Sequence, residues 1–280
     1  MNGLINFNSD KTKSSFVPLD IFPTEADEVP EGYAGWLIFL DELNSAPPSV
    51  QSAAYKLLDG YVGQTKLHKK VVFLAAGNLS TDKAVVTRQS TASKSRLIHF
   101  ELDNSIEGFT SYMIDKEFDP RIIAYLTYRS DHFHKFDPDT QEHTFPCNRT
   151  WEFVNNMTKS QEDLKAVLPV IAGAIGDGVA IEYVEYTAVF NDLPSIADIL
   201  VNPETAKIPT DSVAKQFAIT THLATKLTRE NIEKASVYVD RLPKELSILC
   251  YRMAVRRDRL LINSPVLDKW IKELNAYVST

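Results

Sequence analysis

Apolar residues are distributed differently in the first third of the chain and in the remainder. Two continuous apolar runs, 36–40 and 71–76, lie between polar and turn-forming segments. Runs of this length without alternation are typical of strands that are covered on both faces, as in a parallel sheet. A weaker strand pattern covers 97–102. These runs predict an α/β region in the first third of the chain.

Helical spacing follows the first apolar run and dominates beyond about residue 105. Apolar residues after Ser45 recur every three or four positions, which predicts a helix capped by Ser45, with proline in its first turn and Gly60 at its end. Further helices are expected to begin at Pro120 and after Cys147, and to cover 161–172, 211–227, 230–239, 243–257 and 265–277.

Composition and charge exclude several classes of protein. Acidic residues outnumber basic residues by 37 to 30, which argues against a nucleic-acid binder driven by bulk positive charge. The only cysteines, Cys147 and Cys250, exclude a disulfide framework and a four-cysteine zinc site, so a reducing cytoplasmic location is expected. The apolar stretch 167–175 is too short to span a bilayer, and no membrane partner is expected.

The clearest local motif is the apolar run that ends in Asp41 and Glu42. Burying an unpaired carboxylate is expensive, so both acids are expected at the carboxyl end of the strand, where α/β sheets bind ligands. This is the form of a Walker B element, in which Asp41 would hold Mg²⁺ through its water shell and Glu42 would orient an attacking water. The alternative is a strand that runs into an acidic turn, and the motif alone leaves both open.

A polar residue also ends the second apolar run. Asn78 follows Gly77 there, and an asparagine at this place can position a water beside a γ-phosphate, which is the sensor 1 role in ring-forming ATPases. An Asn after Gly is by itself more typical of a turn. Its spacing, one helix and one strand after a Walker B pattern, favours the functional interpretation.

Taken together, these segments resemble the MoxR-like branch of the AAA+ ATPases, a P-loop NTPase family. The resemblance rests on the segment from Gly35 to Pro47 with Val50 and Gln51, on 71–78, and on 90–97, and it extends over roughly 16–155. It implies an α/β class with a partial AAA+ core and parallel sheet, followed by an all-α lid and a helical extension.

The resemblance also implies roles for three arginines. Arg96, just before the third apolar run, would be an arginine finger presented to the nucleotide of a neighbouring subunit. Arg88 is a second candidate for nucleotide binding, although a surface ion pair is the simpler interpretation for it. Arg149, at the start of a lid helix, corresponds to the sensor 2 arginine that would reach the γ-phosphate in its own subunit.

A P-loop NTPase also needs G-x-x-x-x-G-K-[ST] before its Walker B strand, and the 280 residues contain no such motif. In this family the Walker A loop precedes the region near Gly3 and Leu4. The strand that leads into it lies between the strands that correspond here to 71–76 and 97–102. Without it, both are expected to have unpaired edges and uncovered apolar faces. We therefore expect a complementary N-terminal Walker A fragment or extension.

These expectations define three regions and one function. Residues 1–105 would form a truncated AAA+ core, 106–170 a lid with sensor 2, and 171–280 a helical extension. The protein would use ATP and Mg²⁺ at subunit interfaces of a homo-oligomeric ring, expected to be a hexamer, to remodel an unknown client protein. Two alternatives are a non-hydrolysing ring subunit that supplies Arg96 in trans, and a helical protein-binding module.

Two further groups of residues have simpler structural explanations. His132 and His134 are expected to be solvated loop histidines, because residues two apart do not share a helix face and no other ligand completes a zinc site. Four arginines between 252 and 259 predict a solvated, ion-paired helix face, with an acidic partner as the alternative.

Overall fold

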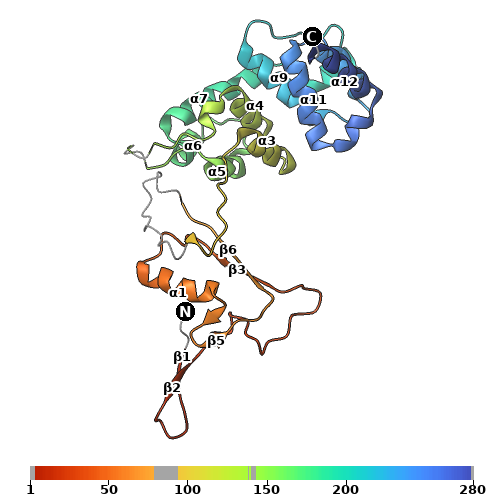
Figure 1. Cartoon of the computed structure of the whole chain (residues 1–280). Coiled ribbons are helices and arrows are strands. Elements are labelled where there is room, and N and C mark those ends of the chain that lie inside the picture. Colours follow the sequence, from red (N-terminus) through yellow and green to blue (C-terminus); the bar gives the residue numbers. More distant parts are fainter. Residues whose placement is uncertain (1–3, 79–93, 138, 140–142, 279–280) are drawn as a thin grey trace. The chain divides into compact units, whose positions relative to one another are not determined.

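The computed structural model describes residues 4–78, 94–137, 139 and 143–278 of the chain, which has a mixed α/β fold (Figure 1). The chain divides into two compact units, Met1–Leu102 and Asp103–Thr280, called unit 1 and unit 2 below. Each unit is described by itself. Arg88 lies outside the described residues.

Unit 1 contains a two-stranded parallel sheet of β3 (Trp36–Leu40) and β6 (Val71–Ala75), in the register Trp36↔Val71 to Leu40↔Ala75. Both strands confirm the prediction from the apolar runs. The predicted strand over 97–102 is wrong, because this segment has no strand and pairs with none of the described residues. Its apolar side chains are almost fully exposed, with 85% for Ile98 and Phe100 and 94% for Leu102.

Among the described residues, only one face of the β3–β6 pair is covered. Ile38 and Phe73 point to that face and pack against a small core formed by Phe22, Leu57, Val62 and Leu67. Leu37, Phe39, Val72 and Leu74 alternate with them and are between 51% and 63% exposed. Parallel sheets are normally covered on both faces. The uncovered apolar face agrees with the sequence-based expectation for this sheet.

The helix after β3 is α1 (Pro48–Leu58), and it supplies Leu57 to the core of unit 1. Ser45 does not cap it, because the cap position is Pro47 and no side chain makes a cap hydrogen bond. Gly60 follows its end with a backbone φ of 86°, a value that glycine adopts without strain.

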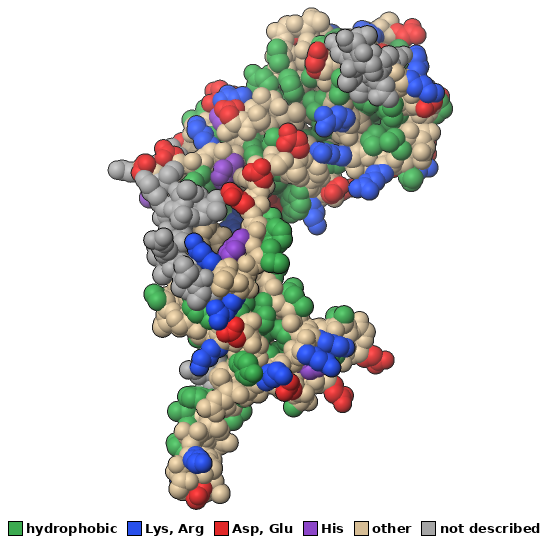
Figure 2. Space-filling model, in the orientation of Figure 1, with side chains coloured by type: hydrophobic (Ala, Val, Ile, Leu, Met, Phe, Trp, Pro, Cys, Tyr) green, Lys and Arg blue, Asp and Glu red, His purple; other side chains and the backbone are tan. Residues whose placement is uncertain are grey.

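Two hairpins of unit 1 were not predicted from the sequence. Strands β1 (Leu4–Phe7) and β2 (Ser14–Val17) form one, and β4 (Tyr61–Val62) and β5 (Thr65–Lys66) form the other. Every residue of β1 and β2 is exposed, and Figure 2 shows hydrophobic side chains on the surface of this hairpin. Strand-like periodicity is weak here because neither face of the hairpin is buried.

Unit 2 is helical. Its elements are α3 (Ile106–Asp115), α4 (Pro120–Tyr128), η2 (Ser130–His132), α5 (Asn148–Thr158), α6 (Leu168–Ile175), α7 (Asp177–Thr187), η3 (Ala188–Asp192), α8 (Ile196–Val201), α9 (Val213–Lys226), α10 (Ile232–Val239), α11 (Lys244–Arg257), η4 (Arg259–Asn263) and α12 (Pro265–Val278).

Most of these helices confirm the sequence-based predictions. Helix α4 begins at Pro120, whose fixed φ suits the first turn, and the Asp119 carboxylate accepts a hydrogen bond from the Arg121 amide as a cap. The helix expected over 161–172 is α6, which begins later than expected, at Leu168, and ends at Ile175. Helices α3, α7 and α8 were not predicted.

The core of unit 2 is much larger than that of unit 1 and joins α3 to α12 in one apolar cluster. Tyr125, Trp151 and Tyr183 are fully buried at its centre with mutual ring contacts. His132 lies beside them and is 2% exposed, so its prediction as a solvated histidine is wrong, whereas His134 is exposed as predicted. In the part of the chain that the structure describes, no helix combines the length and hydrophobicity needed to cross a bilayer.

Candidate functional site

The loop after β3 places Asp41 and Glu42 at the carboxyl edge of the parallel sheet. Pairing between the two chain segments continues beyond the strands, since the Ala76 amide donates to Leu40 O (3.0 Å) and the Leu43 amide donates to Ala76 O (3.0 Å). Asp41 and Glu42 therefore lie between two backbone contacts with the segment that leads to Asn78. Both acids are exposed, as expected for unpaired carboxylates.

The backbone turns sharply at the second acid. Glu42 has a φ of 51°, in the left-handed region that non-glycine residues rarely adopt. Such a conformation costs about 1–3 kcal/mol and persists only where neighbouring contacts hold it. The Asp41 side chain contributes by accepting a hydrogen bond from the Glu42 amide at 3.0 Å. The loop thus presents two adjacent carboxylates in a constrained conformation.

A side chain that the sequence analysis did not single out joins the two loops. The side-chain nitrogen Nδ2 of Asn44 donates to the backbone oxygen of Asn78 at 2.6 Å. Asn44 Oδ1 accepts a hydrogen bond from the backbone amide of Asn78 at 3.2 Å. These two hydrogen bonds connect residues that are 34 positions apart in the sequence. The candidate catalytic acids and Asn78 are therefore brought to one edge of the sheet by Asn44.

Two residues make room for this bridge and hold its loop. A Cβ atom on Gly77 would lie 2.2 Å from Asn44 Oδ1, so any side chain at this position would displace the Asn44 side chain from its present place. Gln51 of α1 is 2% exposed, and its side-chain amide donates to Ala46 O at 2.9 Å. In the sequence, these roles are indicated only by the glycine before Asn78 and by a polar residue, Gln51, within a predicted amphipathic helix.

Arg96 is placed at the other end of α1 from this loop. Its Nε donates to Asp59 Oδ1 at 2.7 Å and its Nη2 donates to Asp59 Oδ2 at 3.2 Å. The hydrogen bonds from Arg96 lower the pKa of the Asp59 carboxyl. Asp59 directly follows the 11 residues of α1, so it lies about 16 Å along the helix from the loop that holds Asp41. The structure does not bring Arg96 together with the two acids.

Arg149 belongs to unit 2. It is the second residue of α5 and is exposed, near helix amide groups that have no partner within the helix. Among the described residues, no group of three or more His, Cys, Asp or Glu side chains is placed to bind a metal ion. Mg²⁺ does not need such a group, because it commonly binds one or two carboxylates together with substrate phosphates and water.

Comparisons with known proteins do not identify the chain. No family model, curated protein or solved structure matches it.

Proposed function

We propose that the chain is the C-terminal portion of a MoxR-like AAA+ ATPase, which binds and hydrolyses ATP–Mg²⁺ at subunit interfaces to remodel a partner protein. The observation that carries the proposal is the common edge of the β3–β6 sheet, where Asn44 joins the loop of Asp41 and Glu42 to the backbone of Asn78. Ligands of parallel α/β sheets bind at the carboxyl ends of the strands.

Each residue at this edge has a chemical role in the proposal. Asp41 holds Mg²⁺ through water, and Glu42 accepts a hydrogen bond from the attacking water and orients it. Asn78 supplies an amide that can hold the same water. The constrained backbone at Glu42 supports this assignment, because strained conformations cluster at functional sites.

The arginines act at subunit boundaries in this proposal. Arg96 serves as a finger for the nucleotide of a neighbouring subunit in a homo-oligomeric ring, proposed to be a hexamer. Its pairing with Asp59, about 16 Å along α1 from the acid loop, supports a role in trans rather than at its own site. Arg149 would serve as sensor 2 in cis, and Arg88 as an additional nucleotide contact.

The proposal requires a P-loop from a segment that is not among these 280 residues. The uncovered face of the β3–β6 pair supports this requirement, because Leu37, Phe39, Val72 and Leu74 would be covered in a complete parallel sheet. A two-stranded sheet is also marginally stable by itself. We propose that the P-loop segment supplies the missing strand and covers this face.

The decisive experiment uses the chain completed by its P-loop segment, found in the reading frame upstream of Met1 or in a co-purifying polypeptide. Glu42→Gln should lower ATP turnover at least about 100-fold while ATP binding persists, because only the water-orienting carboxylate is lost. Glu31→Gln, an exposed acid in another loop of unit 1, is the matched control and should leave turnover unchanged. Equal turnover of the two variants would rule out the catalytic assignment.

Mixed assemblies test the role of Arg96. Arg96→Ala should abolish hydrolysis without preventing nucleotide binding, and it should do so at the site of the adjacent subunit. Co-assembly with a Glu42→Gln subunit should therefore restore activity at interfaces that combine one intact Glu42 with one intact Arg96. If no P-loop segment exists and the chain binds a protein without ATP, the alternative of a helical binding module is supported instead.

A further inference from the structure

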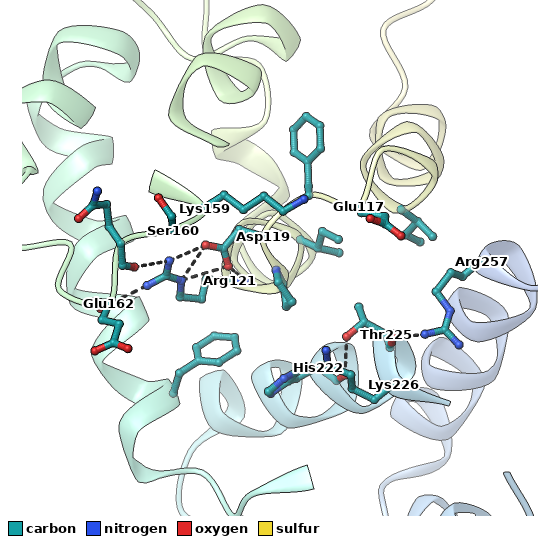
Figure 3. Close-up of a pocket in the computed structure, with 16 residues that line it drawn as sticks. Glu117, Asp119, Arg121, Lys159, Ser160, Glu162, His222, Thr225, Lys226 and Arg257 are labelled. Carbon is teal, nitrogen blue, oxygen red and sulfur yellow. Dashed lines mark hydrogen bonds and ion pairs between the residues drawn. The ribbon is translucent and has the colours of Figure 1, made fainter. Parts of the chain in front are cut away.

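Unit 2 contains a cavity of about 620 Å³ that the proposed ATPase function does not use. It lies between the turn from α3 to α4, the segment after α5, η3, α9 and the end of α11 (Figure 3). Its volume is in the range of small-molecule sites. Lys159 and Ser160 at its edge directly follow α5, whereas Arg149 lies at the start of that 11-residue helix, about 14 Å along its axis.

One wall of the cavity is a closed polar network. Arg121 forms an ion pair with Asp119 through Nε and Nη2 and also donates to the carbonyl oxygens of Thr158 and Gln161. This pair is largely buried, with side chains 15% and 5% exposed. Because both charged groups already have partners within the protein, they form part of the cavity wall, and other residues would have to bind a ligand.

Three other cations line the same cavity. Arg257 donates from Nη1 to Thr225 O at the end of α9, and burial lowers the pKa of its guanidinium. Lys159 and Lys226 are exposed at the rim. Within the described residues, none of the three is within ion-pair distance of a carboxylate. The cavity therefore has positive charges that its own chain does not neutralise by direct contact.

The rest of the lining combines apolar side chains with a neutral histidine, two carboxylates and three uncharged polar residues, Ser160, Gln161 and Thr225. Ile123 and Phe190 contribute apolar surface, and the His222 ring lies 6.0 Å from that of Phe190. Burial, followed by the charge of Lys226, lowers the pKa of His222, so its ring is uncharged at neutral pH. The Glu117 and Glu162 carboxylates are also in the lining, and they leave three unpaired cations against two carboxylates.

Each cation also has a local explanation. Lys159 follows the end of α5 and Lys226 ends α9, where helix dipoles favour positive charge. The dipoles explain why each helix ends in a cation. They do not explain why two helix ends and Arg257 line one cavity beside an apolar surface. A cavity that combines apolar surface with polar groups and perturbed pKa values is a common form of ligand site.

We propose that this cavity binds a small organic anion. Its carboxylate or phosphate group would lie against Lys159, Lys226 and Arg257, and its apolar part would contact Ile123 and Phe190. The proposal is independent of the ATPase assignment, because no residue of the Walker B edge takes part in it.

The proposal can be tested on the full chain with phenyl phosphate, benzoate and phenol as probes. The carbon-bound ring protons of His222 report on the cavity by NMR and can be identified by their loss in His222→Gln. Phenyl phosphate or benzoate should shift these signals saturably with one site per chain, and phenol should not. The anion that binds more tightly shows whether the cavity prefers a phosphate or a carboxylate group. No saturable shift with either anion would overturn the proposal.

Charge variants establish that the rim cations bind the probe. Lys226→Gln and Lys159→Gln should each weaken binding about tenfold, the effect of losing one charge-assisted hydrogen bond. Lys234→Gln, an exposed lysine of α10 outside the cavity, is the matched control and should bind like the unchanged protein. All three lysines are at exposed positions, so circular dichroism should show unchanged helix content in each variant. Equal affinities of all three variants would contradict the proposal.

Discussion

At the scale of single residues, His132 is a polar side chain that the fold holds in its neutral form. Its Nδ1 lies 2.6 Å from Tyr125 Oη, and Arg129 Nη2 donates to its Nε2 at 2.9 Å. Because Nε2 accepts a hydrogen bond, the ring proton belongs on Nδ1 and is donated to Tyr125. Burial, then the charge of Arg129, lowers the pKa of His132, and the neighbouring Asp131 opposes this only in part.

This environment predicts a pH dependence of stability. In the unfolded chain a histidine titrates at a pKa of about 6.5, so between that value and the lower folded pKa the unfolded state binds more protons. The free energy of unfolding of unit 2 should therefore fall as pH decreases below about 6.5. Urea unfolding followed by circular dichroism from pH 7.5 to 5 measures it. His222 acts in the same direction, because its pKa is lowered too.

A substitution tests whether His132 causes this pH dependence of the free energy of unfolding. In His132→Gln, the decrease in stability between pH 7.5 and 5 should be smaller than in the unchanged protein, with the remainder due to His222. His134→Gln, at an exposed neighbouring position, should keep the full decrease. If the free energy of unfolding falls equally with pH in His132→Gln and His134→Gln, the burial of a neutral His132 does not cause the pH dependence.

At the scale of elements, helices α4 and α5 are joined by polar contacts as well as by the apolar core. Asp119 caps α4 with its side chain, and its backbone amide donates a hydrogen bond to Asn155 Oδ1 on α5 at 2.8 Å. Arg121 reaches the carbonyl of Thr158 at the end of α5. The buried Asp119–Arg121 pair thus fixes how the two helices meet.

Removing one charge of this pair should be costly. Asp119→Asn keeps a good capping side chain but leaves the Arg121 guanidinium partly buried without its carboxylate, and breaking such a pair costs about 3 kcal/mol or more. The midpoint of urea unfolding of unit 2 should fall accordingly. Asp240→Asn, an exposed residue after α10, should change it by less than about 0.5 kcal/mol. Similar losses in both variants would show that the ion pair is not what joins the helices.

At the scale of the whole molecule, burial is unequal between the two units. Unit 2 has one extensive core from α3 to α12, whereas the apolar cluster of unit 1 has four buried residues and lies on one face of the sheet. The segment 98–105 between them has no regular secondary structure, and Phe100 is 85% exposed. The chain is therefore expected to respond to proteolysis as two units with different resistance.

Limited digestion with chymotrypsin should cut at Phe100 and at exposed sites of unit 1 before it cuts within the helices of unit 2. Mass spectrometry should identify a persistent fragment that begins at Glu101, and circular dichroism should show that it is helical. Phe100→Ala and Leu102→Ala together should delay its formation, whereas Phe153→Ala, at an exposed position within α5, should not. Early cleavage within α4 or α5 would contradict the division at Leu102.

Features that depend on neighbours along the chain could be predicted from the amino-acid sequence. The apolar runs predicted β3 and β6, prolines and caps predicted the start of α4, and the acids after β3 indicated a polar edge of the sheet. Periodicity and capping are local properties, so a single sequence contains them. The resemblance supplied roles for Arg96 and Arg149, and these stay predictions.

Contacts between residues that are distant in the sequence are visible only in the folded chain. Asn44 contacts Asn78 across 34 positions, and the carbonyl of the buried His132 accepts a hydrogen bond from the Trp151 ring of α5. Residues 97–102 find no strand to pair with among the described residues. The strand pattern of 97–102 was misleading because a strand forms only where a partner completes its hydrogen bonds. Likewise, the cations of the cavity in unit 2 are spread from Lys159 to Arg257 in the sequence, and they line one cavity because α9 packs against both α4 and α11.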